Sequence, residues 1–88
     1  MRRYRESKMM SRMRFLPQLI DTLEKRIEQD KEALQEIRIC MLEGKKTLRM
    51  KNKETLLSAR IEQNRSTVQK LHMEKVNIAQ QLNDMIII

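Results

Sequence analysis

The feature that most constrains the fold of this chain is a stripe of apolar residues whose spacing alternates between four and three positions. Side chains with this spacing lie along one face of an α-helix, and the pattern is the a/d repeat of a coiled coil. The stripe runs from residue 9 to residue 41, and Asp30 is its only polar member. Its members are Met9, Met13, Leu16, Ile20, Leu23, Ile27, Asp30, Leu34, Ile37 and Met41.

A second stripe with the same spacing occupies the C-terminal part of the chain. It is displaced by one residue from the frame of the first stripe, which fails where that frame meets Lys51, Thr55 and Ser58. The interruption predicts two helices, over residues about 16–43 and 54–87, joined by a basic connection at 44–53. The members of the second stripe are Leu57, Ile61, Asn64, Val68, Leu71, Lys75, Ile78, Leu82 and Met85.

The stripes predict an all-α fold in which two long helices pair antiparallel as a helical hairpin or coiled coil. The composition agrees, because the 40% hydrophobic residues are mainly Leu, Ile and Met, and Gly44 and Pro17 are the only residues of their types. Proline suits the first turn of a helix, so we expect residues 1–14 to form a basic arm before a helical domain at 15–88. Gly44 is the expected C-cap of the first helix. One helix of about 70 residues with a stutter near 44–53 is the alternative.

An isolated hairpin of this size would leave much of its apolar stripe in water, because a chain of 88 residues buries little surface on its own. We therefore expect two copies to form a homodimer, which gives a four-helix assembly. The expected dimer or partner contacts are the apolar stripe residues from Leu16 to Met85. The pattern leaves open whether the copies pair parallel or antiparallel, and how many chains take part.

Three polar residues within the stripes are candidates for fixing the register of the helices. They are Asp30 in the first stripe and Asn64 and Lys75 in the second. A polar group at a core position disfavours alternative registers at some cost in stability. In an antiparallel hairpin we expect Asp30 to face Lys75, because the two residues flank the connection at comparable distances.

The sequence offers few residues that could carry catalysis. Cys40 and His72 are the only Cys and His, and a zinc site needs three or four such ligands. With Gly44 as its only glycine, the chain also has no Gly-rich phosphate loop. We expect a protein that is not an enzyme and takes no metal, cofactor or small-molecule substrate. No run reaches the roughly 18 apolar residues needed to cross a bilayer, so no membrane partner is expected.

Charge is distributed unevenly around the net value of +7. Residues 1–14 carry six basic side chains against Glu6, whereas residues 15–44 carry seven acidic side chains against four basic ones. Basic clusters of this kind favour phosphate-rich partners, and with so few aromatic residues any contact with DNA should be non-specific and salt-dependent. The candidate phosphate contacts in the connection are Lys45, Lys46, Arg49, Lys51 and Lys53.

The end of the second stripe is similar to a known family. Its sequence is Lys75-Val76-Asn77-Ile78-Ala79-Gln80-Gln81-Leu82-Asn83-Asp84-Met85-Ile86. This run resembles the end of the N-terminal helical domain of the inhibitor of growth family of chromatin proteins, typically Lys-Val-x-Leu-Ala-x-Gln-x-Tyr-Asp/Glu-x-Val. Asn83 stands in place of the tyrosine, and Ile87 stands where an acidic residue is common.

Two upstream segments extend this resemblance over most of the chain. Leu16-Pro17 followed by Leu19 looks like the Leu-Pro-x-x-Leu opening of that domain, and Leu56-Leu57 with Ile61 falls where its second helix has apolar residues. The resemblance implies a helical hairpin that dimerises and docks into histone acetyltransferase or deacetylase complexes in the nucleus. The zinc-binding PHD finger of the family is not part of the resemblance.

These observations lead to one functional hypothesis and two alternatives. The first is a non-catalytic dimerisation or scaffold subunit of a chromatin-modifying complex, acting through the Leu and Ile stripes. The second is a generic coiled-coil adaptor or tether in the cytoplasm. The third is a basic helical protein that binds nucleic acid itself.

Overall fold

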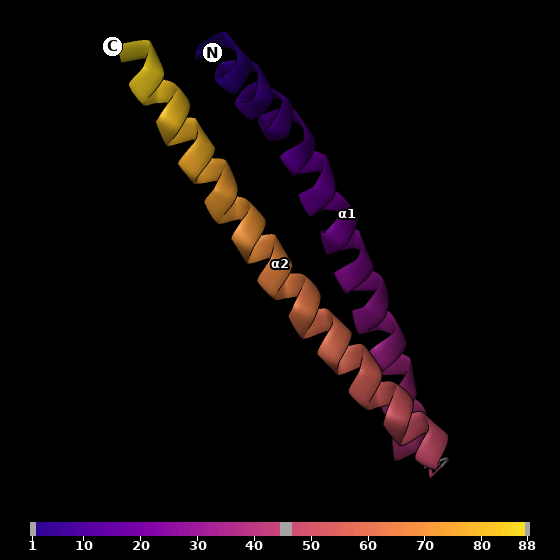
Figure 1. Cartoon of the computed structure of the whole chain (residues 1–88). Coiled ribbons are helices and arrows are strands. Elements are labelled where there is room, and N and C mark those ends of the chain that lie inside the picture. The colour runs from indigo at the N-terminus through magenta and orange to yellow at the C-terminus, as the bar shows by residue number, and fades with distance from the viewer. Residues whose placement is uncertain (1, 45–46, 88) are drawn as a thin grey trace.

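The structure, a computed structural model, describes residues 2–44 and 47–87, with side chains at 5–44 and 47–85. The chain forms two α-helices in these ranges, α1 at Arg2–Leu42 and α2 at Leu48–Ile87. The helices pack antiparallel into a rod of 65 × 17 × 15 Å, with the first and last turns at the same end (Figure 1). The prediction of an all-α helical hairpin is confirmed, and the single long helix is not what the chain forms.

Gly44 and Thr47 define the turn between the helices. Gly44 has a φ of 90°, a left-handed conformation that glycine adopts without a steric penalty, and its N–H donates to the carbonyl of Met41 at 3.2 Å. The predicted C-cap is therefore present. Thr47 caps α2, because its Oγ1 accepts a hydrogen bond of 3.2 Å from the N–H of Met50.

The observed start of α2 differs from the predicted one near residue 54. The sequence predicts that the basic run at 44–53 is a polar connection, but Arg49, Lys51 and Lys53 lie within the first turns of α2. The apolar frame of the second stripe continues upstream to Glu54 and Met50, which are both half-buried. Partial burial of this upstream part of the stripe, together with the Thr47 cap, extends the helix to Leu48.

The observed start of α1 also differs from the prediction, because residues 2–14 belong to the helix rather than to a separate arm. Pro17 lies inside α1 on an exposed face, where its missing N–H removes only one hydrogen bond of the helix. Met9 and Met13 continue the first stripe and are half-buried, so packing against α2 extends across the proline. Residue 1 of the predicted arm lies outside the described residues.

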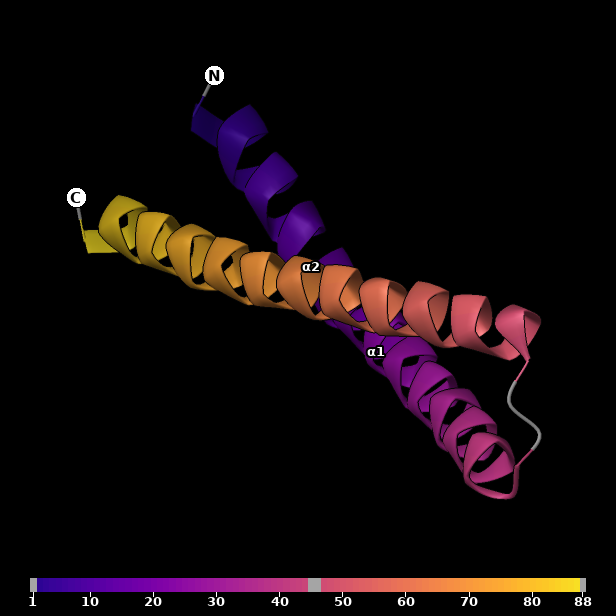
Figure 2. The same cartoon turned by 90° about the horizontal axis from the view of Figure 1, so that it is seen from below.

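The two helices cross rather than run parallel over their whole length. When the rod is seen from below, α1 and α2 cross near the middle, and the N-terminal part of α1 diverges from the C-terminal part of α2 (Figure 2). The same ends also stand apart in the first view (Figure 1). We call this end of the rod, which carries both termini, the open end, and the opposite end the turn end.

Candidate functional site

The predicted stripes meet at the interface between α1 and α2. Ile27 and Leu34 of α1 form one buried cluster with Leu57 and Ile61 of α2. Leu16 and Ile20 are buried further toward the open end. Burial of a Leu or Ile side chain contributes about 1.5–3 kcal/mol, so these buried residues together make the main apolar contribution to the hairpin.

Most of the remaining stripe residues are only half-buried, because a pair of helices covers one flank of each stripe. In α1 these residues are interspersed with the buried ones, whereas in α2 every stripe residue after Ile61 is half-buried. We call it the half-buried seam, and it consists of Leu23, Ile37, Met41, Val68, Leu71, Ile78, Leu82 and Met85. The structure thus places all the predicted stripe residues at one interface but leaves this set partly in contact with water.

Asp30, the polar member of the first stripe, binds Arg60 of α2. The guanidinium donates two hydrogen bonds to the carboxylate, of 2.6 Å from an Nη and 2.8 Å from Nε. The Asp30 side chain is only 10% exposed, whereas that of Arg60 is 54% exposed and reaches in from the flank of the interface. Such two-point contacts favour one register strongly, because sliding one helix breaks both hydrogen bonds.

The predicted pairing of Asp30 with Lys75 is therefore not observed. The turn is centred near residue 45, and Asp30 and Arg60 lie at equal distances on either side of it, whereas Lys75 lies twice as far away. The prediction placed the connection too late in the chain and so misjudged the register. Lys75 and Asn64 are both half-buried on α2, at the stripe positions expected for them.

The hydrogen bonds from Arg60 hold the pKa of Asp30 below its usual value, although partial burial of the carboxyl opposes the shift. The same pairing raises the pKa of Arg60. Both groups are therefore charged at neutral pH.

Two further ion pairs join the helices on either side of Asp30. Toward the open end, Arg12 donates to both carboxylate oxygens of Glu74, at 2.7 and 3.2 Å, and these hydrogen bonds lower the pKa of Glu74. Toward the turn end, Arg38 lies 3.6 Å from Glu54. These pairs were not predicted from the sequence, because Arg12, Arg38 and Glu74 lie beside the stripes and Glu54 lies upstream of the predicted start of the second stripe.

The exposed large apolar side chains lie toward the two ends of the rod. Among the described residues, they occur in α1 up to Leu19 and from Ile39 onward, and in α2 up to Leu56 and from Met73 onward. Leu42 and Leu48, beside the turn, are the most exposed of them at 87% and 76%. The middle of the rod therefore presents a polar outer surface.

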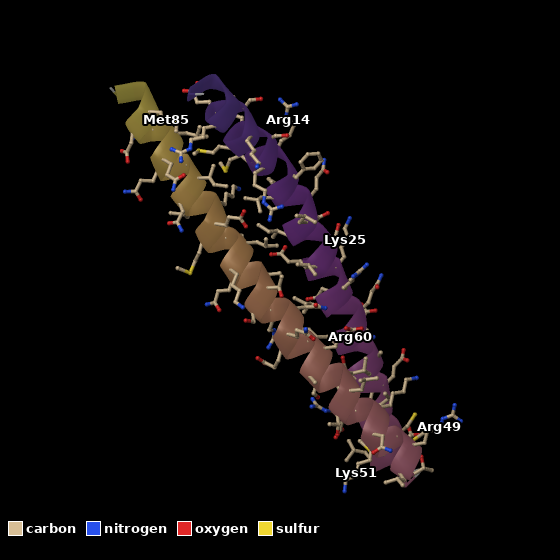
Figure 3. All side chains as sticks on the ribbon, in the orientation of Figure 1. Arg14, Lys25, Arg49, Lys51, Arg60 and Met85 are labelled. Atoms are coloured by element: carbon tan, nitrogen blue, oxygen red, sulfur yellow. The ribbon has the colours of Figure 1, made fainter. Side chains whose placement is uncertain are left out.

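The predicted phosphate contacts lie at the turn end. Arg49, Lys51 and Lys53 are exposed on the first turns of α2, and the labelled Arg49 and Lys51 project from this end of the rod (Figure 3). Lys45 and Lys46 lie outside the described residues. This surface stays a predicted contact for phosphate groups.

Cys40 is a half-buried free thiol, and His72 is exposed with its Nε2 4.0 Å from a carboxylate oxygen of Glu24. Within residues 2–44 and 47–87, no three His, Cys, Asp or Glu side chains converge on a position where they could hold a metal ion. Neither described helix includes a stretch that is long and apolar enough to span a membrane.

Comparisons with family models, with curated proteins and with solved structures found no match to this chain.

Proposed function

We propose that this protein is a non-catalytic assembly subunit that dimerises through its half-buried seam and acts as a scaffold for partner chains. The observation that carries the proposal is the incomplete cover of an otherwise regular apolar stripe. Leu71, Ile78 and Leu82 lie within one stretch of α2 and each remains partly in contact with water. A second hairpin laid against this stripe would exclude that water and yield a four-helix arrangement.

We further propose that the partners are subunits of a histone acetyltransferase or deacetylase complex in the nucleus. This part of the proposal depends on the resemblance of the residues from Lys75 to Ile86, and of Leu16-Pro17, to the inhibitor of growth family. The basic side chains of the turn end, among them Arg49 and Lys51, would suit a location close to DNA.

Replacement of Leu71 by Gln tests the assembly claim. Leu71→Gln leaves the buried cluster untouched but places an amide in the proposed dimer contact, so we expect the dimer dissociation constant to rise at least about tenfold. Analytical ultracentrifugation over a range of concentrations measures this change. Co-purification of histone-modifying subunits with the tagged chain should fall in parallel.

Lys70→Gln is the matched control, because it introduces the same side chain at an exposed neighbouring position. It should leave assembly and co-purification unchanged. Circular dichroism establishes that each variant remains helical, and Leu82→Gln serves as a second seam variant. A wild-type chain that stays monomeric at micromolar concentration would contradict the dimerisation claim.

A further inference from the structure

An apolar groove lies between the diverging helices at the open end of the rod. It has a volume of about 430 Å³ and is formed mainly by Arg5, Lys8, Met9, Arg12, Phe15 and Ile78. An adjoining hollow of about 400 Å³ shares Arg5 and Met9 and extends toward Met85 of α2. Together they form one hollow surface at the N-terminal part of α1 and the C-terminal part of α2, which we call the open-end groove.

The floor of the open-end groove consists of apolar side chains that the hairpin does not cover. Phe15 is 55% exposed, and Met9, Ile78 and Met85 are half-buried. Apolar surface left in water costs about 25 cal/mol per Å², so a ligand that covers a phenyl ring and three flexible aliphatic chains would bind favourably. Methionine side chains in particular adapt their shape to a partner surface.

The rim of the open-end groove is basic. Arg5, Lys8 and Arg12 line the two hollows, against one acidic residue, Asp84, in the adjoining hollow. Arg12 is joined to Glu74 across the groove, which fixes its guanidinium at the rim, whereas Arg5 borders both hollows. An apolar floor with a basic rim selects a ligand that is apolar on one face and negatively charged beside it.

The shape of the open-end groove suits an α-helix. The main hollow is lined by one face of α1 and by Ile78 of α2, and the adjoining hollow by residues of both helices, so a third helix can pack its side chains against α1 and α2 there. We propose that the open-end groove binds an amphipathic helix of a partner protein, with Leu, Ile or Met on its buried face and Asp or Glu on its flanks. This inference rests on the proposed function, since it names the class of partner that the scaffold would hold.

A second copy of this chain does not have the required surface among its described residues. The acidic part of α1, from Asp21 to Glu36, carries no exposed large apolar side chain. The exposed apolar residues lie toward the two ends of the rod, where the basic residues described at 5–14 and 49–53 also lie. Met73 and Val76 of α2 lie among Lys70 and Lys75 as well as Glu74, so a second copy offers no exposed apolar face with uniformly acidic flanks.

Binding of designed peptides to the full-length protein tests this proposal. The probe is a fluorescein-labelled peptide of about three heptads with Leu at positions a and d and Glu at e and g, since the glutamates prevent it from pairing with itself. A second peptide carries Lys in place of each Glu, and a third carries Gln in place of each Leu. We expect only the first peptide to bind tightly, with fluorescence anisotropy as the measurement.

Two pairs of variants localise the binding. Phe15→Gln should weaken the acidic peptide about tenfold, whereas Met73→Gln removes an equally exposed apolar side chain outside the groove and should have no effect. Arg5→Glu should weaken binding and make it less sensitive to salt, whereas Lys70→Glu makes the same charge change on the α2 surface away from the groove. All four positions are exposed, so each variant should keep the hairpin fold.

The outcomes separate this proposal from the proposed function. Equal binding of the acidic and lysine peptides, or equal effects of Phe15→Gln and Met73→Gln, would overturn it even if the chain dimerises as proposed. The proposal would also be overturned if anionic lipid vesicles bound the chain in a Phe15-dependent manner while the acidic peptide did not. Peptide binding by a monomeric chain would support the groove while contradicting dimerisation.

Discussion

At the scale of single residues, the contact between Asp30 and Arg60 determines the register of the hairpin. Asp30 replaces an apolar residue in a regular stripe, and the loss of apolar burial is offset by two short, charge-assisted hydrogen bonds. Because the carboxyl is nearly buried and its partner is half exposed, the guanidinium keeps contact with water while it satisfies the carboxylate. A slip by one turn would leave this carboxylate without its partner.

A double-mutant cycle tests this assignment. Asp30→Asn and Arg60→Gln should each lower the free energy of unfolding, and the double variant should lose less than the sum of the two single changes. Lys75→Gln provides the matched comparison, because its effect should simply add to that of Asp30→Asn. Urea denaturation followed by circular dichroism gives the values, and coupling of Asp30 to Lys75 rather than to Arg60 would refute the register.

The same pair predicts a dependence of stability on pH. The pKa of Asp30 is lower in the folded chain than in the unfolded chain, so its contribution to stability is complete above the unfolded value of about 3.9. That contribution is lost as the pH falls through the folded pKa. The coupling between Asp30 and Arg60 should therefore be full at neutral pH and vanish in strong acid, and a coupling that persists after protonation would contradict an ionic contact.

At the scale of helices, the ends of α1 and α2 depend on local features as well as on the stripes. Gly44 ends α1 by adopting a positive φ, and Thr47 starts α2 by accepting the N–H of Met50. Arg49, Lys51 and Lys53 then place positive charge in the first turns of α2, which the helix dipole disfavours. The Thr47 cap is therefore important for the start of this helix.

Replacement of Thr47 by Ala should lower the free energy of unfolding by about 1 kcal/mol, because the cap hydrogen bond is lost. Thr67→Ala is the control. Thr67 lies within α2, and its hydroxyl bonds only the carbonyl of Gln63, so alanine there should be neutral or slightly stabilising. Thermal and urea denaturation measure both changes, and an equal loss in the two variants would show that Thr47 does not act as a cap.

The apolar stripes account for most of what could be predicted from the sequence. The stripes predicted the helical class, the hairpin and the apolar interface, because each depends on a periodicity that can be read directly. The helix starts predicted from Pro17 and from the basic run were wrong. Helix α1 tolerates Pro17 on an exposed face, and α2 tolerates the basic residues in its first turns because Thr47 caps the helix. Arg60 was missed because it lies beside the stripe, and its role appears only once the centre of the turn is known.

At the scale of the whole molecule, the rod has a polar middle and partly apolar, basic ends. The buried stripe residues extend from Leu16 to Leu34 in α1 but only from Leu57 to Ile61 in α2, whose stripe is half-buried toward the C-terminal end, where the helices diverge (Figure 2). Assembly through the half-buried seam and binding at the open-end groove would share Ile78 and Met85, so the two contacts overlap at the open end of the rod. Both depend on the antiparallel order of α1 and α2.

The most direct test of that order is a distance between spin labels at Ser11 of α1 and Asn77 of α2, in a Cys40→Ser background. Both positions are exposed and lie toward the open end. Labelled protein is diluted with unlabelled protein so that pulsed electron resonance reports distances within one chain. The hairpin predicts a distance on the order of 20–40 Å, because the helix axes at this end stand further apart than the 8–10 Å of close packing and the labels add to that separation. A distance beyond the range of the method would contradict the hairpin, because one continuous helix would separate the two sites by about 100 Å.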